Sequence, residues 1–198
     1  MTIYINLAVE DDLSEAVLRK ILRSFNRAFQ VKTVYKKGGF GYLKKQIKSF
    51  NQASQHIPFL VLTDLDQATC PVELITDWIK FPKNPNLIFR VAVREVESWV
   101  LADRESFAQY LGLQKEQIPR ETDLLDNPKE TLFQIVKKCS KREIKNSILP
   151  MKGAKIGPDY NGKLTQFITD NWKLQNAQKN SESLNRTIKC LNKFEITC

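Results

Sequence analysis

Five acidic residues share one property, which is that each closely follows an apolar, β-rich stretch of the sequence. They are Glu10, Asp64, Asp66, Glu95 and Glu97. A spacing of two within each later pair directs both side chains to the same face while the chain stays extended. Carboxylates this close repel one another unless a cation neutralises them. The donor set suits a hard divalent ion, Mg²⁺ or Mn²⁺, and such ions support phosphoryl chemistry by activating water and stabilising the leaving oxygen.

These acids are positioned by predicted strands that alternate with predicted helices. The apolar patterns predict strands at residues 2–9, 31–35, 59–62 and 87–93, and helices at residues 13–29, 42–53 and 72–80. This alternation is typical of the α/β class with a mostly parallel sheet. Function collects at the carboxyl ends of the strands in such a sheet. We therefore expect the five carboxylates to lie in one small volume.

The second half of the chain is more polar, and its pattern is helical. We expect helices at Arg104–Leu111, Pro128–Ser140, Gly162–Asn171 and Ser181–Lys193. Most of the excess positive charge also follows residue 103. The sequence thus predicts an α/β core at residues 1–103 and a basic helical extension at residues 104–198, packed on the core as one compact unit.

The residue inventory excludes several kinds of chemistry. The four cysteines, Cys70, Cys139, Cys190 and Cys198, are scattered, and His56 is the one histidine, which argues against a zinc site or a His-based triad. Scattered cysteines without a secretory leader indicate reduced thiols, and hence a cytoplasmic protein. No apolar run approaches the roughly 18 residues of a membrane span. A formal charge of +9 favours a polyanionic partner.

Several acids also have a purely structural interpretation. Asp12 with Glu15 fits a capping box for the first helix, and Asp103 fits the cap of a helix that starts at residue 104. Asp66 taken alone fits a turn, and Glu95 fits an ion pair with a nearby arginine. Trp78, Trp99 and Trp172 are best explained as packing residues.

Basic residues provide candidates for holding phosphates. The predicted nucleic-acid-binding residues are Lys36, Lys37, Lys152, Lys155 and Lys163. The first two precede Gly38 and Gly39, whose backbone amides can approach a phosphate closely. Lys152 or Lys155 could neutralise a transition-state oxyanion. For each lysine taken singly, a solvated surface position is the plain alternative.

The order of these motifs resembles a known superfamily. A strand that ends in Glu10, followed by a later strand that runs into Asp64-Leu-Asp66, resembles the Toprim domain of topoisomerases, bacterial primases and OLD-type nucleases. The segment Glu95–Asp103, with the pattern E-x-E-x-W-x-L-A-D, is similar to small bacterial Toprim-like proteins related to OLD-type nucleases and often found near defence genes. Gly157, Tyr160, Lys163 and the segment Ser181–Arg186 also match the end of that family.

The resemblance implies a four-stranded parallel sheet with adjacent first and third strands. It implies that Glu10 acts as general acid/base or metal ligand, that Asp64 and Asp66 bind Mg²⁺, and that Glu95 and Glu97 supply a second metal site. Glu10, Asp64, Asp66 and Glu97 are thus the predicted catalytic residues. The chain departs from the family at residue 11, where an aspartate follows the glutamate in place of the usual glycine.

These observations favour a Mg²⁺-dependent nuclease or nuclease subunit, acting in anti-phage defence with a partner such as an ATPase or another defence component. A non-catalytic Toprim-like module that binds nucleic acid or a partner protein is the alternative, and Asp11 favours it. A third hypothesis is a phosphatase, since residues 64–68 resemble the D-x-D-x-T/V motif of haloacid-dehalogenase enzymes. It fits worse, because position 68 is alanine and the motif is not on the first strand.

Overall fold

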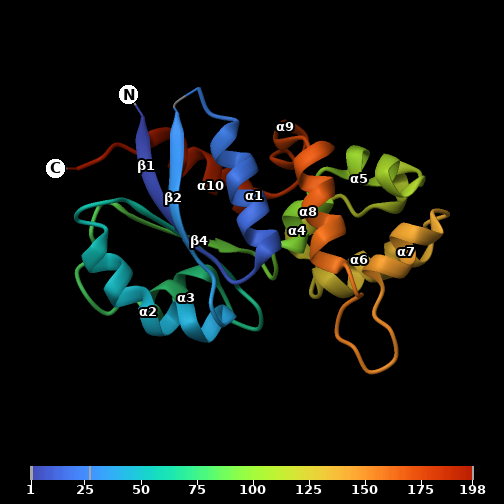
Figure 1. The fold of residues 1–198 in the computed structure, drawn as a ribbon, viewed down its shortest axis with the longest axis horizontal. Helices are drawn as coiled ribbons and strands as arrows, with labels where there is room; N and C mark the ends of the chain where they lie inside the picture. The colour runs from blue at the N-terminus through green and yellow to red at the C-terminus, as the bar shows by residue number, and fades with distance from the viewer. Residues whose placement is uncertain (1, 27, 198) are drawn as a thin grey trace. The chain divides into compact units, whose positions relative to one another are not determined.

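The chain divides into two units, each of which is described by itself. The computed structural model describes residues 2–26 and 28–197, so Cys198, one of the four cysteines, lies outside the described residues. Unit 1 comprises Met1–Val93 and Arg186–Cys198, and unit 2 comprises Arg94–Asn185. The division therefore falls earlier than the predicted boundary after residue 103, and the C-terminal residues return to unit 1 (Figure 1).

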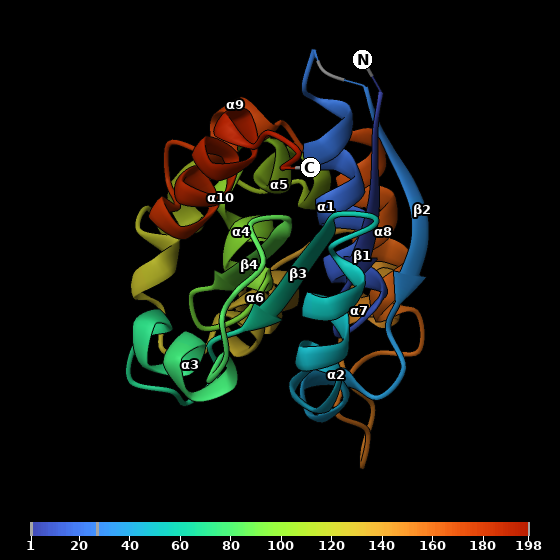
Figure 2. The ribbon, with the colours of Figure 1, turned by 90° about the vertical axis from the view of Figure 1, so that its left-hand side faces the viewer.

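Unit 1 is built on a four-stranded, all-parallel sheet, which confirms the predicted α/β class. The strands are β1 (Ile3–Ala8), β2 (Phe29–Tyr35), β3 (Phe59–Asp64) and β4 (Leu87–Ala92). Their order is β2-β1-β3-β4, so the first and third strands are adjacent as expected (Figure 2). Leu7 pairs with Leu60 between β1 and β3, and Asp64 pairs with Ala92 between β3 and β4. The carboxyl ends of β1, β3 and β4 thus lie side by side.

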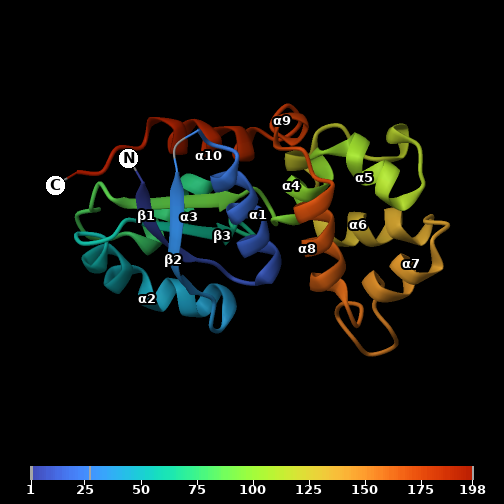
Figure 3. The same ribbon diagram turned by 45° about the horizontal axis from the view of Figure 1, so that its top comes forward.

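Helices cover both faces of this sheet. The helices of unit 1 are α1 (Asp12–Arg23), α2 (Gly39–Ala53), α3 (Pro71–Trp78) and the later part of α10 (Glu182–Lys193). One hydrophobic cluster joins α2 and α3 to the sheet through residues such as Phe50, Trp78 and Phe89. Figure 3 shows α10 on the opposite side of the sheet from α2. Coverage on both faces explains why β3 is buried from residue 59 to 63.

The first helix differs from its prediction at both ends. Its N-cap is Asp11, whose carboxylate accepts a hydrogen bond from the Ser14 backbone N–H (2.8 Å), so the predicted capping box of Asp12 with Glu15 is wrong. The helix ends at Arg23, where Ser24 Oγ donates to the Ile21 carbonyl, and the chain enters β2 at Phe29. The helical spacing of apolar residues therefore continued past the true end of the helix.

Unit 2 is helical. Its helices are α4 (Glu97–Ala102), α5 (Arg104–Leu111), α6 (Pro128–Lys137), α7 (Arg142–Ile148), α8 (Tyr160–Asp170) and α9 (Leu174–Ala177), with short 3₁₀ turns at Lys115–Gln117 and Thr122–Leu124. The sequence predicted α5, α6 and α8 and missed the three shorter helices. Asp103 caps α5 as predicted, accepting from the Ser106 backbone N–H (3.3 Å).

Tryptophans organise the core of unit 2. Trp99 and Trp172 are fully buried. Trp99 Nε1 donates to Ser183 Oγ (2.7 Å), and Trp172 Nε1 donates to the Trp99 carbonyl (3.1 Å). With Trp78 buried in unit 1, the packing role predicted for all three tryptophans is confirmed. Among the helices of the described residues, none has the length and apolar character that crossing a membrane requires.

Candidate metal and phosphate sites

In unit 1, the end of β1 is tied to the end of β3 through a carboxylate. Glu10 Oε1 accepts hydrogen bonds from Thr63 Oγ1 (2.6 Å) and from the Asp64 backbone N–H (2.9 Å). The adjacency of the two strands makes these bonds geometrically possible. The structure therefore brings Glu10 to Asp64, as the sequence predicted for this part of the site.

Glu10 lies in surroundings that disfavour its charge. Burial raises the pKa of Glu10 above its ordinary value, and the negative charges of Asp66 and Asp11 act in the same direction. The two hydrogen bonds from Thr63 and Asp64 oppose that rise. The carboxylate is thus held in place by neutral donors, and a cation near Oε2 would stabilise its ionised form.

Asp66 does not share an extended face with Asp64. β3 ends at Asp64, Leu65 is buried, and Asp66 has a φ of 48°, in the left-handed region. The side-chain alternation argument fails here because the chain turns. Aspartate tolerates the left-handed region better than most residues, at some cost in backbone energy. Asp66 is exposed beside Asp64 and Glu10, and its charge contributes to the raised pKa of Glu10.

In unit 2, Glu97 is a buried carboxylate with one occupied and one free oxygen. It is 1% exposed. Tyr160 Oη donates to its Oε1 (2.6 Å), and Lys129 Nζ lies 3.2 Å from the same oxygen. Oε2 is buried and has no hydrogen-bond partner within the described part of the chain. A buried unpartnered carboxylate oxygen is rare and calls for a ligand or a functional explanation.

Glu95 shares Lys129 with Glu97. Glu95 Oε2 accepts from the Lys129 backbone N–H (2.8 Å), and its Oε1 lies 3.9 Å from Lys129 Nζ. The structure therefore pairs Glu95 with this lysine, whereas the sequence suggested an arginine. Arg94, just before Glu95, has a φ of 59°, so the chain is not extended here and the two glutamates approach through the start of α4.

The pKa of Glu97 is raised, chiefly by burial. The charge of Lys129 and the Tyr160 hydrogen bond lower it, and the neighbouring charge of Glu95 raises it further. Burial prevails because desolvation of a fully enclosed carboxylate outweighs a single, partly exposed ammonium. The cluster of Glu95, Glu97, Lys129 and Tyr160 thus carries a carboxyl group that is poised to exchange a proton or accept a cation.

Both clusters offer oxygen donors of the kind that Mg²⁺ prefers. Unit 1 supplies Glu10, Asp64 and Asp66, and unit 2 supplies Glu95 and Glu97. Within residues 2–26 and 28–197, no three His, Cys, Asp or Glu side chains are already arranged as a metal site. The donors therefore fit a hard cation by type, and within the described residues Glu97 Oε2 is a buried donor that has no hydrogen-bond partner.

The predicted phosphate-binding lysines divide into paired and unpaired groups. Lys36 forms ion pairs with Asp12 and with Glu15 (2.7 Å to the latter), and Lys163 pairs with Glu143 (2.6 Å). The remaining three lysines are exposed and form no ion pair within the described residues; they are Lys37, Lys152 and Lys155.

The loop that contains Gly38 and Gly39 lies at the same end of unit 1 as Glu10. Gly38 (φ 95°) caps α2 without a side chain, and Gly39 (φ 59°) begins that helix. A Cβ placed on Gly39 would stand 4.0 Å from Glu10 Oε2. The first turn of α2 is therefore close to the carboxylate, as expected for a loop that follows a parallel strand.

Sequence reasoning missed two residues that orient the carboxylates. Thr63 was detectable, because it is a polar residue next to Asp64 in an otherwise apolar strand. Lys129 had no local signal, since it lies 34 positions from Glu95 along the chain. Tyr160 was noticed only through the family pattern, and its bond to Glu97 gives it a physical role.

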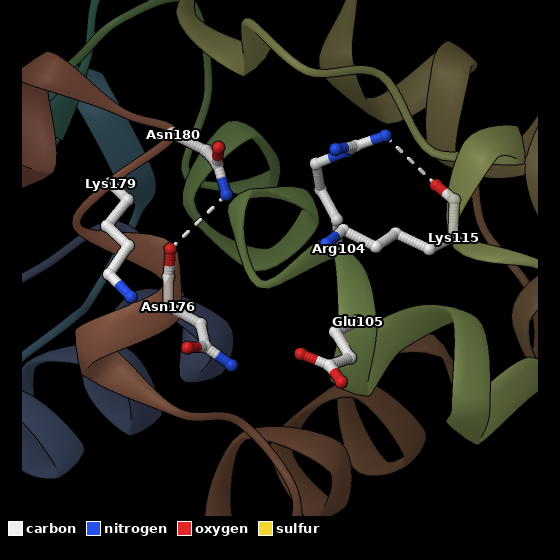
Figure 4. Close-up of a pocket in the computed structure, with 6 residues that line it drawn as sticks. All are labelled: Arg104, Glu105, Lys115, Asn176, Lys179 and Asn180. Carbon is white, nitrogen blue, oxygen red and sulfur yellow. Dashed lines mark hydrogen bonds between the residues drawn. The ribbon is translucent and has the colours of Figure 1, made fainter.

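Unit 2 also contains a small polar cavity of about 210 Å³, which the sequence did not predict. Figure 4 shows the residues that line it, among them Arg104, Lys115 and Asn180. The Arg104 guanidinium donates to the carbonyls of Ile118 (2.9 Å) and Lys115 (3.1 Å), and Asn180 Nδ2 donates to the carbonyl of Ala102 (2.8 Å). These hydrogen bonds fasten the neighbouring loops to α4 and α5, which accounts for the polar groups of the cavity.

The fold and the two carboxylate clusters define an α/β protein with acids at the ends of parallel strands. A family model described as a domain of unknown function, DUF4276, matches residues 10–189, and the chain belongs to this family. The matched range begins at Glu10 and includes all five carboxylates. Searches of curated proteins and of solved structures gave no match.

Proposed function

We propose that the chain is a Mg²⁺-dependent nuclease, or the nuclease subunit of a larger system, that hydrolyses phosphodiester bonds. One observation carries the proposal: Glu10 is fixed across β1 and β3, beside Asp64 and Asp66, by Thr63 and a backbone amide. This is the carboxyl edge of a parallel sheet, where ligands of open α/β folds bind.

Glu10, Asp64 and Asp66 would hold one Mg²⁺ in unit 1. When bound, Mg²⁺ supplies an activated water and stabilises charge on the phosphate oxygens. Thr63 fixes the orientation of Glu10, and the raised pKa of Glu10 suits a carboxyl group that takes a proton during hydrolysis. The fixed orientation and the raised pKa of Glu10 thus support a role as general base.

Glu95 and Glu97 would hold a second Mg²⁺ in unit 2. The free, buried Oε2 of Glu97 supports this assignment, and so does the crowding of two carboxylates around one lysine. Tyr160 holds Glu97 through the other oxygen, which keeps Oε2 directed away from that hydrogen bond. Lys129 balances part of the negative charge.

Nucleic-acid phosphates would be held by lysines that form no ion pair within the described residues. These are Lys37 in unit 1 and Lys152 with Lys155 in unit 2. The backbone of Gly39, close to Glu10, could add amide donors. Lys36 and Lys163 would have to exchange their carboxylate partners for phosphate. The formal charge of +9 favours this kind of partner.

The resemblance to OLD-type nucleases extends the proposal to a biological setting. We place the protein in the cytoplasm of a bacterium, in anti-phage defence, with an ATPase or another defence component as partner. The free thiols of Cys70, Cys139 and Cys190 agree with a reducing compartment.

Cleavage assays with matched isosteric variants test the proposal. Purified protein is incubated with labelled single- and double-stranded DNA and RNA in Mg²⁺ or Mn²⁺, with EDTA as a blank. We expect cleavage that needs the metal and falls by about 100-fold or more in Asp64→Asn and Glu10→Gln. Asp77→Asn is the control, because Asp77 is an exposed carboxylate on α3 that pairs with Lys44 and Lys80.

Undiminished cleavage by a folded Asp64→Asn protein would refute the proposal. Tight, salt-sensitive binding of nucleic acid by the wild type with no cleavage in either metal would select the non-catalytic binding module instead. Circular dichroism melting of each variant distinguishes loss of chemistry from loss of fold.

A further inference from the structure

A second and larger hollow lies in unit 1, away from the carboxylates. It has a volume of about 560 Å³ and is bounded by β4, by the end of α10 and by the tail that follows this helix. Figure 3 shows α10 and the tail on one side of the sheet. This volume is within the range of roughly 300–1,000 Å³ that is typical of small-molecule sites.

The walls of this hollow are mainly apolar. Ile88 and Arg90 are two residues apart on β4, so their side chains share one face of the sheet. Phe194 adds further apolar surface. An apolar body of a ligand could therefore be desolvated here.

The tail is fastened and forms a fixed wall. Asn86 Nδ2 donates to the Thr197 carbonyl (2.8 Å), and the Thr197 backbone N–H donates to Asn86 Oδ1 (2.9 Å). These paired bonds hold the segment from residue 194 to 197 beside the start of β4. The tail therefore forms one fixed side of a hollow that stays partly open to solvent.

Two cations of the pocket are held by neutral oxygen atoms. Arg90 Nε donates to Thr187 Oγ1 (3.2 Å), and Lys83 Nζ donates to the carbonyls of Leu87 (2.7 Å) and Asn84 (3.3 Å). In the part of the chain that the structure describes, no carboxylate forms an ion pair with Arg90, Lys83 or Lys193. The one acidic residue in the lining is Glu195, which is exposed on the tail.

Two of these cations are partly desolvated. Burial lowers the pKa of Arg90 and of Lys83, and Cys190, which also hydrogen-bonds Arg90, opposes this fall at both groups. The nearby charge of Arg186 lowers the pKa of Arg90 further. Half-buried positive charges of this kind are stabilised by an anion that can replace the lost hydration. The pocket thus combines an apolar wall with positive charge that no carboxylate of the described residues pairs with.

We propose that this pocket binds a small amphiphilic carboxylate, with the carboxylate beside Arg90 and Lys193 and the apolar body against Ile88 and Phe194. A guanidinium matches a carboxylate in geometry and charge. The inference does not depend on the nuclease assignment, because none of the five acidic residues lines this pocket.

Calorimetric titration with octanoate tests the proposal, and octanamide serves as the neutral isostere. We expect octanoate to bind at one site and octanamide to bind about tenfold more weakly or not at all, since the charge-assisted bonds are lost. Arg90→Gln lowers the affinity for octanoate by about tenfold. Lys193→Gln, an exposed change that leaves the fold intact, lowers it by about threefold.

Lys80→Gln is the matched control, because Lys80 is an exposed lysine of unit 1 outside the pocket. Equal affinities for octanoate and octanamide, or an unchanged octanoate affinity in a folded Lys193→Gln protein, would overturn the proposal. So would the absence of heat with both ligands. Cleavage of nucleic acid by Lys193→Gln remains at the wild-type level, which separates this pocket from the proposed nuclease function.

Discussion

Glu10 in unit 1 and Glu97 in unit 2 are both carboxylates largely removed from water, but their partners differ in charge. Glu10 is held by a hydroxyl and a backbone amide, both neutral. Glu97 is held by Tyr160 and by the ammonium of Lys129. Glu10 is therefore positioned without being neutralised, whereas the charge of Glu97 is partly balanced by Lys129 within its own unit.

The comparison shows that a buried carboxylate can be held in a fixed orientation with or without a cation that balances its charge. A carboxylate held by neutral donors keeps its affinity for an external cation, because its charge is not compensated. A carboxylate paired with a lysine depends on that lysine for the stability of the fold. Variants of the two clusters should accordingly have unequal effects on stability.

The largest effect is expected when the balancing charge of Glu97 is removed. Lys129→Met leaves a buried carboxylate without its cation, and we expect a loss of about 3 kcal/mol in the free energy of unfolding at pH 8. The side chain of Lys129 is 34% exposed, which keeps the loss at the lower end of the range for buried pairs. Urea denaturation measures it.

The double variant Lys129→Met/Glu97→Gln provides the control for that prediction. Because it removes both charges, it should recover more than half of the loss. A double variant as unstable as Lys129→Met alone would show that the lysine acts through packing and not through Glu97.

The two clusters also differ in how far the sequence could predict them. The acids at the ends of β1 and β3 were found from strand patterns, because parallel strands bring their carboxyl ends to one edge whatever the side-chain details. The arrangement of Glu95 with Lys129 depends on how α6 packs within unit 2, and no local pattern encodes that packing. Asp66 was placed on the wrong face, since a turn replaces the extended chain there.

A similar distinction applies to the fold. Long amphipathic or buried segments such as β3 and α5 were predicted because burial imposes a period on the sequence. Short helices such as α4 and α9 were missed, since six and four residues are too few to establish a period. Their stability comes from the packing around Trp99 and Trp172.

Removal of the single hydroxyl donors gives the next largest effects. Tyr160→Phe removes the bond to Glu97 Oε1, and we expect a loss of about 2 kcal/mol, because Glu97 is enclosed and its other oxygen is already unpartnered. Thr63→Val removes the bond to Glu10, and we expect about 1 kcal/mol, since the Asp64 backbone N–H still donates. Thermal and urea denaturation of the two proteins provide the comparison.

The order of these two losses is the informative result. A larger loss in Thr63→Val than in Tyr160→Phe would mean that Glu10, and not Glu97, is the more strongly desolvated group. Phe107→Leu, a buried apolar change in unit 2, calibrates the effect of packing without touching either carboxylate.

The pH dependence of stability should distinguish the clusters as well. The folded-state pKa of Glu97 is raised above the ordinary value of 4.5 by burial, so the folded state binds more protons than the unfolded state in the window above pH 4.5. The contribution of Glu97 to the free energy of unfolding is fully present below pH 4.5. It is lost as the pH rises through the folded-state pKa, at up to about 1.4 kcal/mol per pH unit.

Glu97→Gln should therefore gain stability relative to the wild type as the pH is raised from 4.5. Glu10→Gln should show the same sign with a smaller amplitude, because Glu10 is less completely buried than Glu97 and desolvation is the main cause of both shifts. Urea midpoints across pH 4 to 8 measure both. A stability gain on lowering the pH toward 4.5 that persists unchanged in Glu97→Gln would assign this dependence to other groups.

The smallest effect is expected at Asp66, where a left-handed backbone and a negative charge near Glu10 each cost a little stability. Asp66→Gly removes the cost of a left-handed φ of 48° and one of the charges that disfavour ionised Glu10, so we expect a gain of about 0.5 kcal/mol or less in stability. Asp66→Ala removes the same charge but keeps a Cβ in the left-handed region, so it should be less stable than Asp66→Gly by about 1 kcal/mol. Equal stabilities of the two variants would show that the turn after β3 relaxes freely. In that case the strained backbone at Asp66 would not be what holds the Asp66 carboxylate beside Glu10.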